Sequence, residues 1–343
     1  MVDLQLAREM NYRILGRSGV KVSSLGLGTD NFANPTSPKE SIEIIDRAID
    51  AGINFIDTAN TYADGESERI IGKAFKENGN RNKVLIATKV HYRVGKGPND
   101  EGNSRLHIIK ACEDSLKLLQ TDYIDLYQLH RPSFDIPLDE TLGALSDLVT
   151  QGKVRYIGSS TSPAWKIMES LHISELRKYP YFISEQSPYN LLDRRIENEL
   201  VPFCKHNNLG IIAWSPLAMG LLAGRYTNAK KMPKDSRGSL RKGIYSERIT
   251  ESGISIGKKF VKLAQKNNIK PVQLATLWVK DQPGVTFPLI GPKTLKQLND
   301  YLPVLDMKLN KSIIKECDLL VPPGSAVANF HNSAAWMKMR LDW

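Results

Sequence analysis

The stretch GINFIDTANTYADGESERIIG, from Gly52 to Gly72, passes from an apolar segment through a short polar loop into a helical segment. Its apolar part, residues 53–59, predicts a buried strand. A carboxylate, Asp57, stands near the end of that strand, and a phenol, Tyr62, follows five residues later. A lone Asp at a strand end usually caps a turn, and a lone Tyr usually packs against its neighbours. The pair therefore indicates a functional site only if other segments bring reactive side chains to the same place.

The same alternation of a β-rich run and a helical segment recurs along the chain. The predicted strands are residues 24–29, 53–59, 84–90, 124–130, 154–160, 182–186, 210–214 and 285–290. Most are apolar on both faces, which is typical of strands covered on two sides in a parallel sheet. Amphipathic stretches such as PKESIEIIDRAIDAG and RLHIIKACEDSLKLLQ lie between them. Eight β/α units predict an α/β fold, a closed (β/α)8 TIM barrel that forms one domain over residues 1–343; an open doubly wound sheet is the alternative.

Three segments lie outside the eight β/α units that form a minimal barrel. MNYRILGRSGVKVSS, before the first unit, predicts an N-terminal β-hairpin around Ser18-Gly19 that caps the bottom of the barrel. A loop over about residues 215–252 and a tail over about residues 319–343 predict extended loops at the C-terminal face. Long segments without clear periodicity inside a compact domain are usually lids or binding loops. We therefore expect the loop to cover a cofactor, and the tail either to cover the pocket or to form a subunit contact.

Composition and charge narrow the class of protein. The chain of 343 residues is 41% hydrophobic and 24% charged, as in ordinary soluble proteins. The charged start lacks a signal-peptide core, and the longest uncharged run, 209–224, is too short and too broken to span a bilayer. Three distant cysteines argue against a metal site or disulfides and fit a reducing cytoplasm. The net charge of +10 comes from scattered lysines, which argues against a nucleic-acid partner.

Reactive side chains stand at the ends of three predicted strands, namely Asp57, Lys89 and His130. Since barrel enzymes carry their chemistry at the C-terminal ends of the strands, these residues and Tyr62 are expected to share one rim. A lysine in a strand as apolar as VLIATKV needs a partner, and Asp57 is the candidate. We expect the ammonium of Lys89 to lower the pKa of Tyr62, so that the phenol protonates a developing oxyanion while His130 orients it. This set, which has no nucleophile, suits hydride addition to a carbonyl group.

The motifs GINFIDTANTYADGESERIIG, VLIATK, YIDLYQLHRP and GIIAWSPLAMGLLAGRY resemble those of the aldo-keto reductase superfamily, in the same order, from about Tyr12 to Leu302. The resemblance implies a (β/α)8 barrel, a nicotinamide cofactor bound without a Rossmann domain, and a catalytic tetrad. Position by position, that tetrad is Asp57, Tyr62, Lys89 and His130. Members that reduce carbon–carbon double bonds of steroids carry Glu in place of this histidine, so His130 favours carbonyl reduction.

The resemblance also implies where a cofactor would lie; a Rossmann fingerprint is not supported, since GLGTDN at Gly26 lacks the third glycine. Ser159, Ser160 and Gln186 would bind the carboxamide, whereas Thr161 replaces the usual asparagine. Tyr189 is the predicted aromatic stacking on the nicotinamide, and Trp214 is the alternative. The full predicted cofactor set is Thr29, Ser159, Ser160, Gln186, Tyr189, Trp214, Ser215, Pro216, Leu217, Gly220, Leu222, Arg225, Ile290, Gly291, Lys293, Gln297 and Asp300.

The phosphate-binding part of this set has a physical basis in the sequence. Gly220 lets backbone amides approach an anion, and Arg225 supplies charge for a pyrophosphate. IGPKTLKQLNDYL opens a helix with Thr294 as the N-cap, and a helix N-terminus after the last barrel strands favours an anion. Lys293 matches the position where family members often place a basic residue against the ribose 2′-phosphate. That match favours NADPH, with NADH as the alternative cofactor.

Three hypotheses for the function follow. The first is NADPH-dependent reduction of a small-molecule aldehyde or ketone, with Phe32, Tyr92 and Trp214 as predicted substrate walls. The second is an interaction or regulatory role, because potassium-channel β-subunits share this barrel and cofactor site. The third is a redox-neutral sugar dehydratase or epimerase. The intact tetrad favours the first hypothesis, whereas the identity of the substrate and the oligomeric state do not follow from the sequence.

Overall fold

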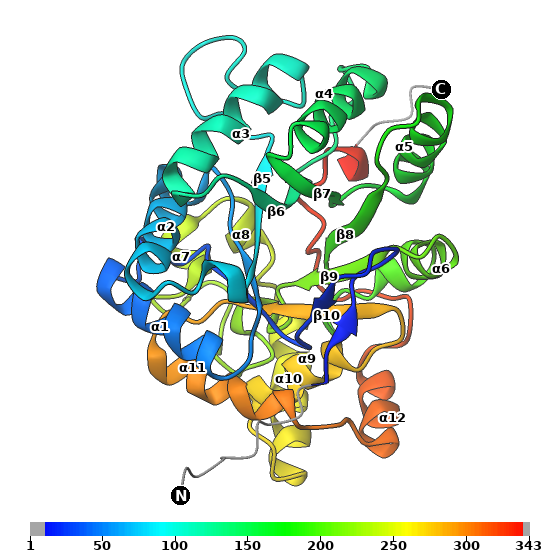
Figure 1. The fold of residues 1–343 in the computed structure, drawn as a ribbon. Coiled ribbons are helices and arrows are strands. Elements are labelled where there is room, and N and C mark those ends of the chain that lie inside the picture. Colours follow the sequence, from blue (N-terminus) through cyan, green and yellow to red (C-terminus); the bar gives the residue numbers. More distant parts are fainter. Residues whose placement is uncertain (1–10, 339–343) are drawn as a thin grey trace, which may run out of the picture.

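A computed structural model describes residues 11–338 of the chain, so residues 1–10 and the last part of the predicted tail, 339–343, lie outside the described residues. Eight parallel strands close into a barrel in the order β10-β3-β4-β5-β6-β7-β8-β9 (Figure 1). The barrel strands are β3 (Gly26–Gly28), β4 (Phe55–Asp57), β5 (Leu85–Val90), β6 (Ile124–Leu129), β7 (Val154–Ser160), β8 (Phe182–Pro188), β9 (Gly210–Trp214) and β10 (Val285–Ile290). Each predicted strand overlaps one of them, and the predicted (β/α)8 barrel is confirmed.

Helices surround the strands on the outside of the barrel (Figure 1). The α-helices are α1 (Pro38–Asp50), α2 (Glu66–Asn78), α3 (Arg105–Leu119), α4 (Leu138–Thr150), α5 (Ala164–Arg177), α6 (Leu200–His206), α7 (Arg237–Arg241), α8 (Ile244–Glu247), α9 (Glu251–Lys266), α10 (Pro271–Lys280), α11 (Leu295–Tyr301) and α12 (Lys311–Leu320). Short 3-10 segments are η1 (Tyr62–Gly65), η2 (Arg81–Lys83), η3 (Arg195–Glu197), η4 (Ala218–Gly220), η5 (Leu302–Leu305) and η6 (Ala335–Lys338).

Local signals in the sequence explain where the helices begin. The side chain of Ser37 accepts a hydrogen bond from the backbone N–H of Glu40, and that of Ser104 does the same for His107. Such N-caps satisfy backbone donors that have no partner within the helix. Thr294 caps α11 through the backbone N–H of Gln297, as the sequence predicted. These caps fix the N-termini of α1, α3 and α11, which follow β3, β5 and β10.

The predicted hairpin is confirmed and fills the end of the barrel opposite that rim. Its strands, β1 (Arg13–Ile14) and β2 (Lys21–Val22), pair antiparallel. Leu15 and Val22 pack inside the barrel with side chains that point inward from six of its strands, including Phe55 and Phe287. Gly16 has a φ of +55°, and a Cβ there would come within 1.9 Å of the carbonyl oxygen of Ile183. Only glycine can bring the hairpin this close to the strands.

Strand register brings the functional side chains together. Asp57 pairs with Ala87, Lys89 with Gln128, and Ser160 with Gln186, all near the C-terminal ends of adjacent strands. A second and larger core packs the outer faces of the strands against the helices. These two layers fix the strand ends, so the polar groups at the rim stand on a rigid support.

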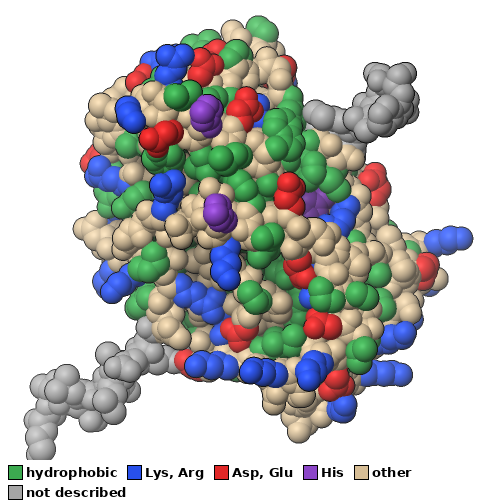
Figure 2. Space-filling view, turned by 90° about the vertical axis from the view of Figure 1, so that its right-hand side faces the viewer, with side chains coloured by type: hydrophobic (Ala, Val, Ile, Leu, Met, Phe, Trp, Pro, Cys, Tyr) green, Lys and Arg blue, Asp and Glu red, His purple; other side chains and the backbone are tan. Residues whose placement is uncertain are grey.

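Two long segments lie beyond the regular barrel. The loop after β9 contains α7 and α8. The tail after α12 runs beside residues 190–198, where the backbone N–H of Arg194 donates to the carbonyl oxygen of Ser325 and that of Val327 donates to the carbonyl oxygen of Leu192. Within the described residues, no helix is both long and apolar enough to cross a membrane. On the face in Figure 2, basic side chains are spread out with acidic and hydrophobic ones between them.

Candidate active site

A cavity of about 620 Å³ opens at the C-terminal ends of the barrel strands. Its walls come from the ends of β3, β4, β6, β7, β8, β9 and β10, from the loop after β9 and from the tail. Cavities of this size hold small molecules and cofactors. Of the predicted residues, the cavity is lined by Thr29, Asp57, Tyr62, Tyr92, His130, Ser160, Gln186, Trp214, Ser215, Pro216, Leu217, Gly220, Arg225, Ile290, Gly291, Lys293, Gln297 and Asp300.

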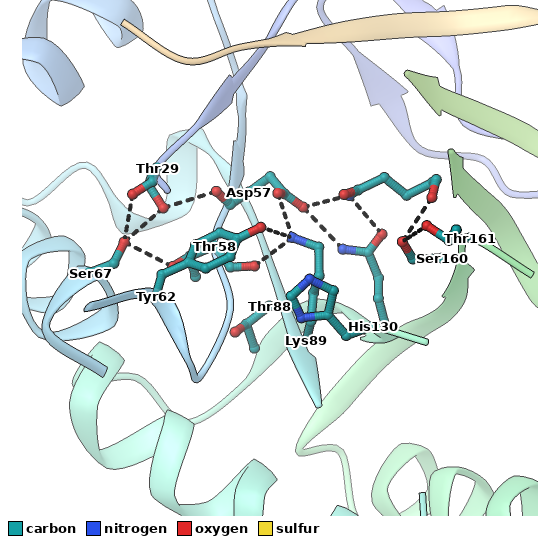
Figure 3. A network of polar contacts seen from close by, with 12 residues as sticks. Thr29, Asp57, Thr58, Tyr62, Ser67, Thr88, Lys89, His130, Ser160 and Thr161 are labelled. Atoms are coloured by element: carbon teal, nitrogen blue, oxygen red, sulfur yellow. Dashed lines mark hydrogen bonds and ion pairs between the residues drawn. The ribbon is translucent and has the colours of Figure 1, made fainter. Parts of the chain in front are cut away.

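Lys89 lies fully buried beneath this cavity and connects two of the predicted catalytic residues (Figure 3). Its Nζ is 2.6 Å from Asp57 Oδ2, 2.8 Å from the carbonyl oxygen of Thr58 and 3.3 Å from Tyr62 Oη. Burial lowers the pKa of Lys89, and the charge of Asp57 opposes that shift. The ammonium therefore has three acceptors, of which one is the phenol that faces the cavity.

The second oxygen of Asp57 is held by two amides. Gln186 Nε2 donates to Asp57 Oδ1 at 2.7 Å, and Gln128 Nε2 donates to it at 3.1 Å. Gln186 also donates to Gln128 Oε1 at 3.2 Å. The carboxylate is thus fixed in orientation, and the Gln186 amide points at Asp57. Sequence reasoning missed Gln128, although a glutamine within the apolar run IDLYQLH was a signal for it.

His130 follows β6 and is buried beside two aromatic rings. Its ring centroid is 5.9 Å from that of Tyr62 and 4.8 Å from that of Tyr92, both edge-on. Burial, with the charges of Arg131 and Lys89, lowers the pKa of His130 well below its ordinary value. The imidazole is therefore neutral and carries one N–H, which suits it to hydrogen bonding a carbonyl oxygen more than to supplying a proton.

The expected lowering of the Tyr62 pKa is wrong for this structure. Burial raises the pKa of Tyr62 well above its ordinary value, and the negative charge of Asp57 raises it further. The same carboxylate that neutralises Lys89 thus also opposes formation of the phenolate. At neutral pH Tyr62 therefore keeps its proton and remains a neutral phenol.

Four predicted binding residues do not line the cavity. Ser159 is turned away from it and donates to Glu185 Oε2 at 2.5 Å. Tyr189, predicted to stack on a nicotinamide, is instead packed in the core, with its ring centroid 5.3 Å from that of Trp278. Leu222 and Phe32 are fully buried in the same core. The assignments of Tyr189 as the stacking ring and of Phe32 as a substrate wall are therefore corrected. Of the two aromatic side chains predicted as candidates for stacking, Trp214 is the one that lines the cavity.

The side of the cavity that is formed by the segments after β9 and β10 has the features of an anion site. Arg225 lines it, pairs with Asp235, and has an Nε without a hydrogen-bond partner among residues 11–338. Lys293 also lines it, and its Nζ donates to the carbonyl oxygen of Asp235 at 3.0 Å. Gln297 Oε1 accepts from the backbone N–H of Lys293 at 2.8 Å. An orphaned guanidinium donor and a nearby ammonium fit the phosphates of a dinucleotide.

Ion pairs connect the loop after β9 to the segment after β3 at the cavity mouth, and sequence reasoning missed them. Arg237 and Arg241, on one face of α7, lie 2.9 and 3.0 Å from the carboxylate oxygens of Asp30, which follows β3. Arg237 also donates to Asn31 Oδ1 at 2.8 Å. The spacing of the two arginines by one helical turn was a local signal, but their partner lies more than two hundred residues earlier in the chain.

A buried carboxyl group, Glu185, stands behind the cavity in β8. It accepts hydrogen bonds from Ser159, from Ser187 Oγ at 2.8 Å and from the backbone N–H of Ser162 at 3.1 Å. Burial outweighs these bonds and raises the pKa of Glu185 to about 7. The carboxyl group is therefore protonated in the folded chain at pH values where the unfolded chain has lost the proton.

This shift predicts a change of stability with pH. Between pH 4.5, the ordinary pKa, and about 7, the folded chain holds a proton that the unfolded chain lacks, so stability falls as the pH rises. Glu185→Gln should remove that loss and, relative to wild type, gain about 3 kcal/mol of unfolding free energy across this window. Urea unfolding at several pH values measures it. The exposed Glu77→Gln is the control, and a Glu185→Gln difference that is flat with pH would contradict the assignment.

Comparisons with known proteins agree with this geometry. A family model described as "Aldo/keto reductase family" matches residues 24–321. The chain is 39% identical to the uncharacterized oxidoreductase YrpG of Bacillus subtilis (strain 168), over 92% of this chain and 97% of that protein. It is 34% identical to a probable voltage-gated potassium channel subunit beta of Oryza sativa subsp. japonica, over 87% and 92%. It is 32% identical to versiconal hemiacetal acetate reductase of Aspergillus parasiticus, over 89% and 95%.

Proposed function

The chain belongs to the aldo/keto reductase family and is an NAD(P)H-dependent oxidoreductase; on that premise we propose that it reduces a small-molecule aldehyde or ketone to an alcohol, with NADPH as the hydride donor and Tyr62 as the acid. One observation carries the proposal. The phenol of Tyr62 faces the cavity while its oxygen lies 3.3 Å from the ammonium of Lys89, which is paired with Asp57 at 2.6 Å.

The chemistry assigns one task to each residue. A bound reduced nicotinamide would supply a hydride. The carbonyl carbon accepts this hydride with its two electrons, the C=O π bond breaks toward oxygen, and Tyr62 Oη transfers its proton to that oxygen. His130 donates a hydrogen bond that positions the carbonyl group, and Lys89 stabilises the phenolate that remains. The products are the alcohol and the oxidised nicotinamide.

The binding groups divide the cavity between cofactor and substrate. Trp214 would stack on the nicotinamide, and Gln186 or Ser160 would bind its carboxamide, because all three line the cavity beside the tetrad. Arg225 and Lys293 would hold the phosphates. Asp30, Arg237 and Arg241 would keep the loop closed over them. We also assign the protein to the cytoplasm, a compartment that suits three free and buried cysteines.

The preference for NADPH is tested at Lys293. Lys293→Ala is expected to raise the Kd for NADPH about tenfold to hundredfold, because a charge-assisted contact to the 2′-phosphate is lost. Its bond to Asp235 also holds the loop, so a smaller loss for NADH is expected too. Fluorescence titration with each cofactor measures both. The control is Asp235→Ala, which removes the side-chain partner of Arg225 but keeps Lys293. Equal losses of affinity for NADPH and NADH in Lys293→Ala would refute the assignment.

A second candidate function is regulation through partner binding, favoured by the likeness to a probable potassium channel β-subunit. Loss of NADPH or NADH absorbance with a panel of aldehydes and ketones separates the two. Turnover with any carbonyl compound supports the reductase. Tight binding of cofactor without turnover of any compound would support the regulatory role instead.

A further inference from the structure

Two arginines line the cavity on the side of His130, and no carboxylate pairs with either of them within residues 11–338. Arg131 follows His130 directly, and Arg248 follows α8. Arg248 is 3% exposed, and its hydrogen bonds go to neutral groups, Asn332 Oδ1 at 2.8 Å and Ser333 Oγ at 3.3 Å. Arg131 donates to His130 O at 2.5 Å and to the same Ser333 Oγ at 3.3 Å.

Among residues 11–338, the other buried arginine, Arg194, is neutralised, and so is its half-buried neighbour Arg195. Arg194 pairs with Glu197 at 2.7 Å and with Asp318 at 2.7 Å, and Arg195 pairs with Asp193 at 2.7 Å. Burying a cation without an anion is costly, so the buried guanidinium of Arg248, with the half-buried Arg131 beside it, indicates a missing anionic partner. Arg131 Nε adds a second sign, because it is buried and has no hydrogen-bond partner in the described part of the chain.

The surroundings increase the positive potential. Burial, opposed by Tyr245 and aided by the charges of Arg131 and Arg237, lowers the pKa of Arg248 to about 10. The guanidinium of Arg248 lies 5.3 Å from the ring centre of Trp214 and 5.6 Å from that of Phe330, and that of Arg131 lies 5.6 Å from the ring centre of Tyr92. Aromatic faces hold the two cations in place, but they neutralise little of their charge.

The position of Arg131 separates it from the predicted site of the cofactor phosphates. Arg131 stands at the end of β6, and Lys293 stands after β10. In the barrel order, three strands separate β6 from β10 on either side, so these two residues lie across the mouth from each other. The predicted phosphate site is thus on the far side, whereas Arg131 is adjacent to a residue of the tetrad.

We propose that Arg131 and Arg248, with the hydroxyl of Ser333 between them, bind an anionic group of the substrate, a carboxylate or a phosphate, so that the enzyme reduces negatively charged aldehydes or ketones. The proposal rests on the proposed reductase function and names its substrate class. The anion stays bound to the arginines while the carbonyl group of the same molecule reaches Tyr62 and His130. The tail supplies Ser333 and therefore takes part in substrate selection.

Matched aldehydes test the proposal with the full chain and NADPH. 4-Formylbenzoate carries the carboxylate, its methyl ester is neutral, and 4-formylphenyl phosphate carries a phosphate. The ester is the more electrophilic aldehyde, so a site indifferent to charge should reduce it fastest. We expect kcat/KM for one of the two anions to exceed that for the ester at least tenfold, and which anion wins identifies the group. A kcat/KM for the ester equal to or above both would overturn the proposal.

Variants locate the effect. Arg248→Gln and Arg131→Gln should each lower kcat/KM for the preferred anion about tenfold to hundredfold, mainly through KM, with the ester changed less than threefold. Arg248→Lys keeps the charge and should recover part of the loss, which guards against misfolding as the cause. Arg17→Gln removes one exposed arginine at the hairpin and is the matched control. Equal losses for anion and ester in the two Gln variants would assign the arginines a structural role.

Failure of the reductase function can be told apart from failure of this inference. If no aldehyde is reduced, thermal stabilisation of the NADP⁺-loaded protein by benzoate, compared with neutral benzamide, reads the anion site alone. Stabilisation by benzoate that disappears in both Arg131→Gln and Arg248→Gln would keep the site and reject the reaction. Stabilisation that is absent in wild type, or equal in wild type and variants, would reject the site.

Discussion

Tyr62→Phe is expected to lower kcat for carbonyl reduction by about 10²–10⁴-fold, because the reaction loses its proton donor. Affinity for the cofactor should stay near the wild-type value, since the substitution removes only the hydroxyl that Lys89 contacts and leaves the proposed phosphate-binding residues, Arg225 and Lys293, unchanged. Absorbance of the reduced cofactor measures turnover, and fluorescence titration measures binding. The raised pKa of Tyr62 and the lowered pKa of His130 also predict that neither group changes its charge near neutral pH, so kcat in wild type should be flat there.

The matched control is Tyr123→Phe. Tyr123 lies at the start of β6, away from the rim, and its hydroxyl makes one long bond of 3.5 Å to Asn82. Its loss should leave turnover unchanged. Full activity of Tyr62→Phe would remove Tyr62 from the acid role, and a parallel loss of cofactor binding would mean that the substitution had disturbed the cavity itself.

The barrel could be predicted from the sequence because each strand has a recognisable local pattern of residues. Runs that are apolar on both faces predict a parallel sheet, and their alternation with amphipathic stretches predicts the helices around it. Three of the four predicted catalytic residues followed from the same signal, since a residue at the C-terminal end of a parallel barrel strand lies at the rim. Asp57, Lys89 and His130 needed no knowledge of the loops, and the structure brings them together with Tyr62.

Residues on loops were harder to place, because periodicity does not encode the path of an irregular backbone. β8 continues to Pro188, two residues past its predicted end, and Tyr189 then turns into the core to donate to Glu197 at 2.6 Å. Phe32 is drawn inward in the same way by the loop after β3. The pairing of Arg131 with Arg248 through Ser333 joins three distant segments, and no local pattern announces such a contact.

The buried ion pair gives the largest expected effect on stability. Asp57→Asn should lower the free energy of unfolding by about 3–5 kcal/mol, because the ammonium of Lys89 then remains fully buried without its anion. Since burial already lowers the pKa of Lys89 and Asp57 opposes that shift, the substitution lowers this pKa further. A lysine with a lowered pKa in the folded state binds its proton less tightly there than in the unfolded chain, so its protonation favours unfolding. The loss of unfolding free energy in Asp57→Asn should therefore shrink as the pH rises toward 10.5, the ordinary pKa of lysine.

A double substitution separates the structural effect from the catalytic one. Asp57→Asn combined with Lys89→Met removes both charges, and it should recover most of the lost stability because no unpaired ion is left in the core. Turnover should stay low in the double variant, since the phenolate of Tyr62 has lost its cation. The exposed pair Asp114 and Lys117 on α3, 3.0 Å apart, is the control: Asp114→Asn should cost less than about 1 kcal/mol. Urea unfolding measures the stability, and the reductase assay measures the turnover. A double variant as unstable as Asp57→Asn would show that the hydrogen bonds from Gln128 and Gln186 to Asp57 contribute more to stability than the ion pair does.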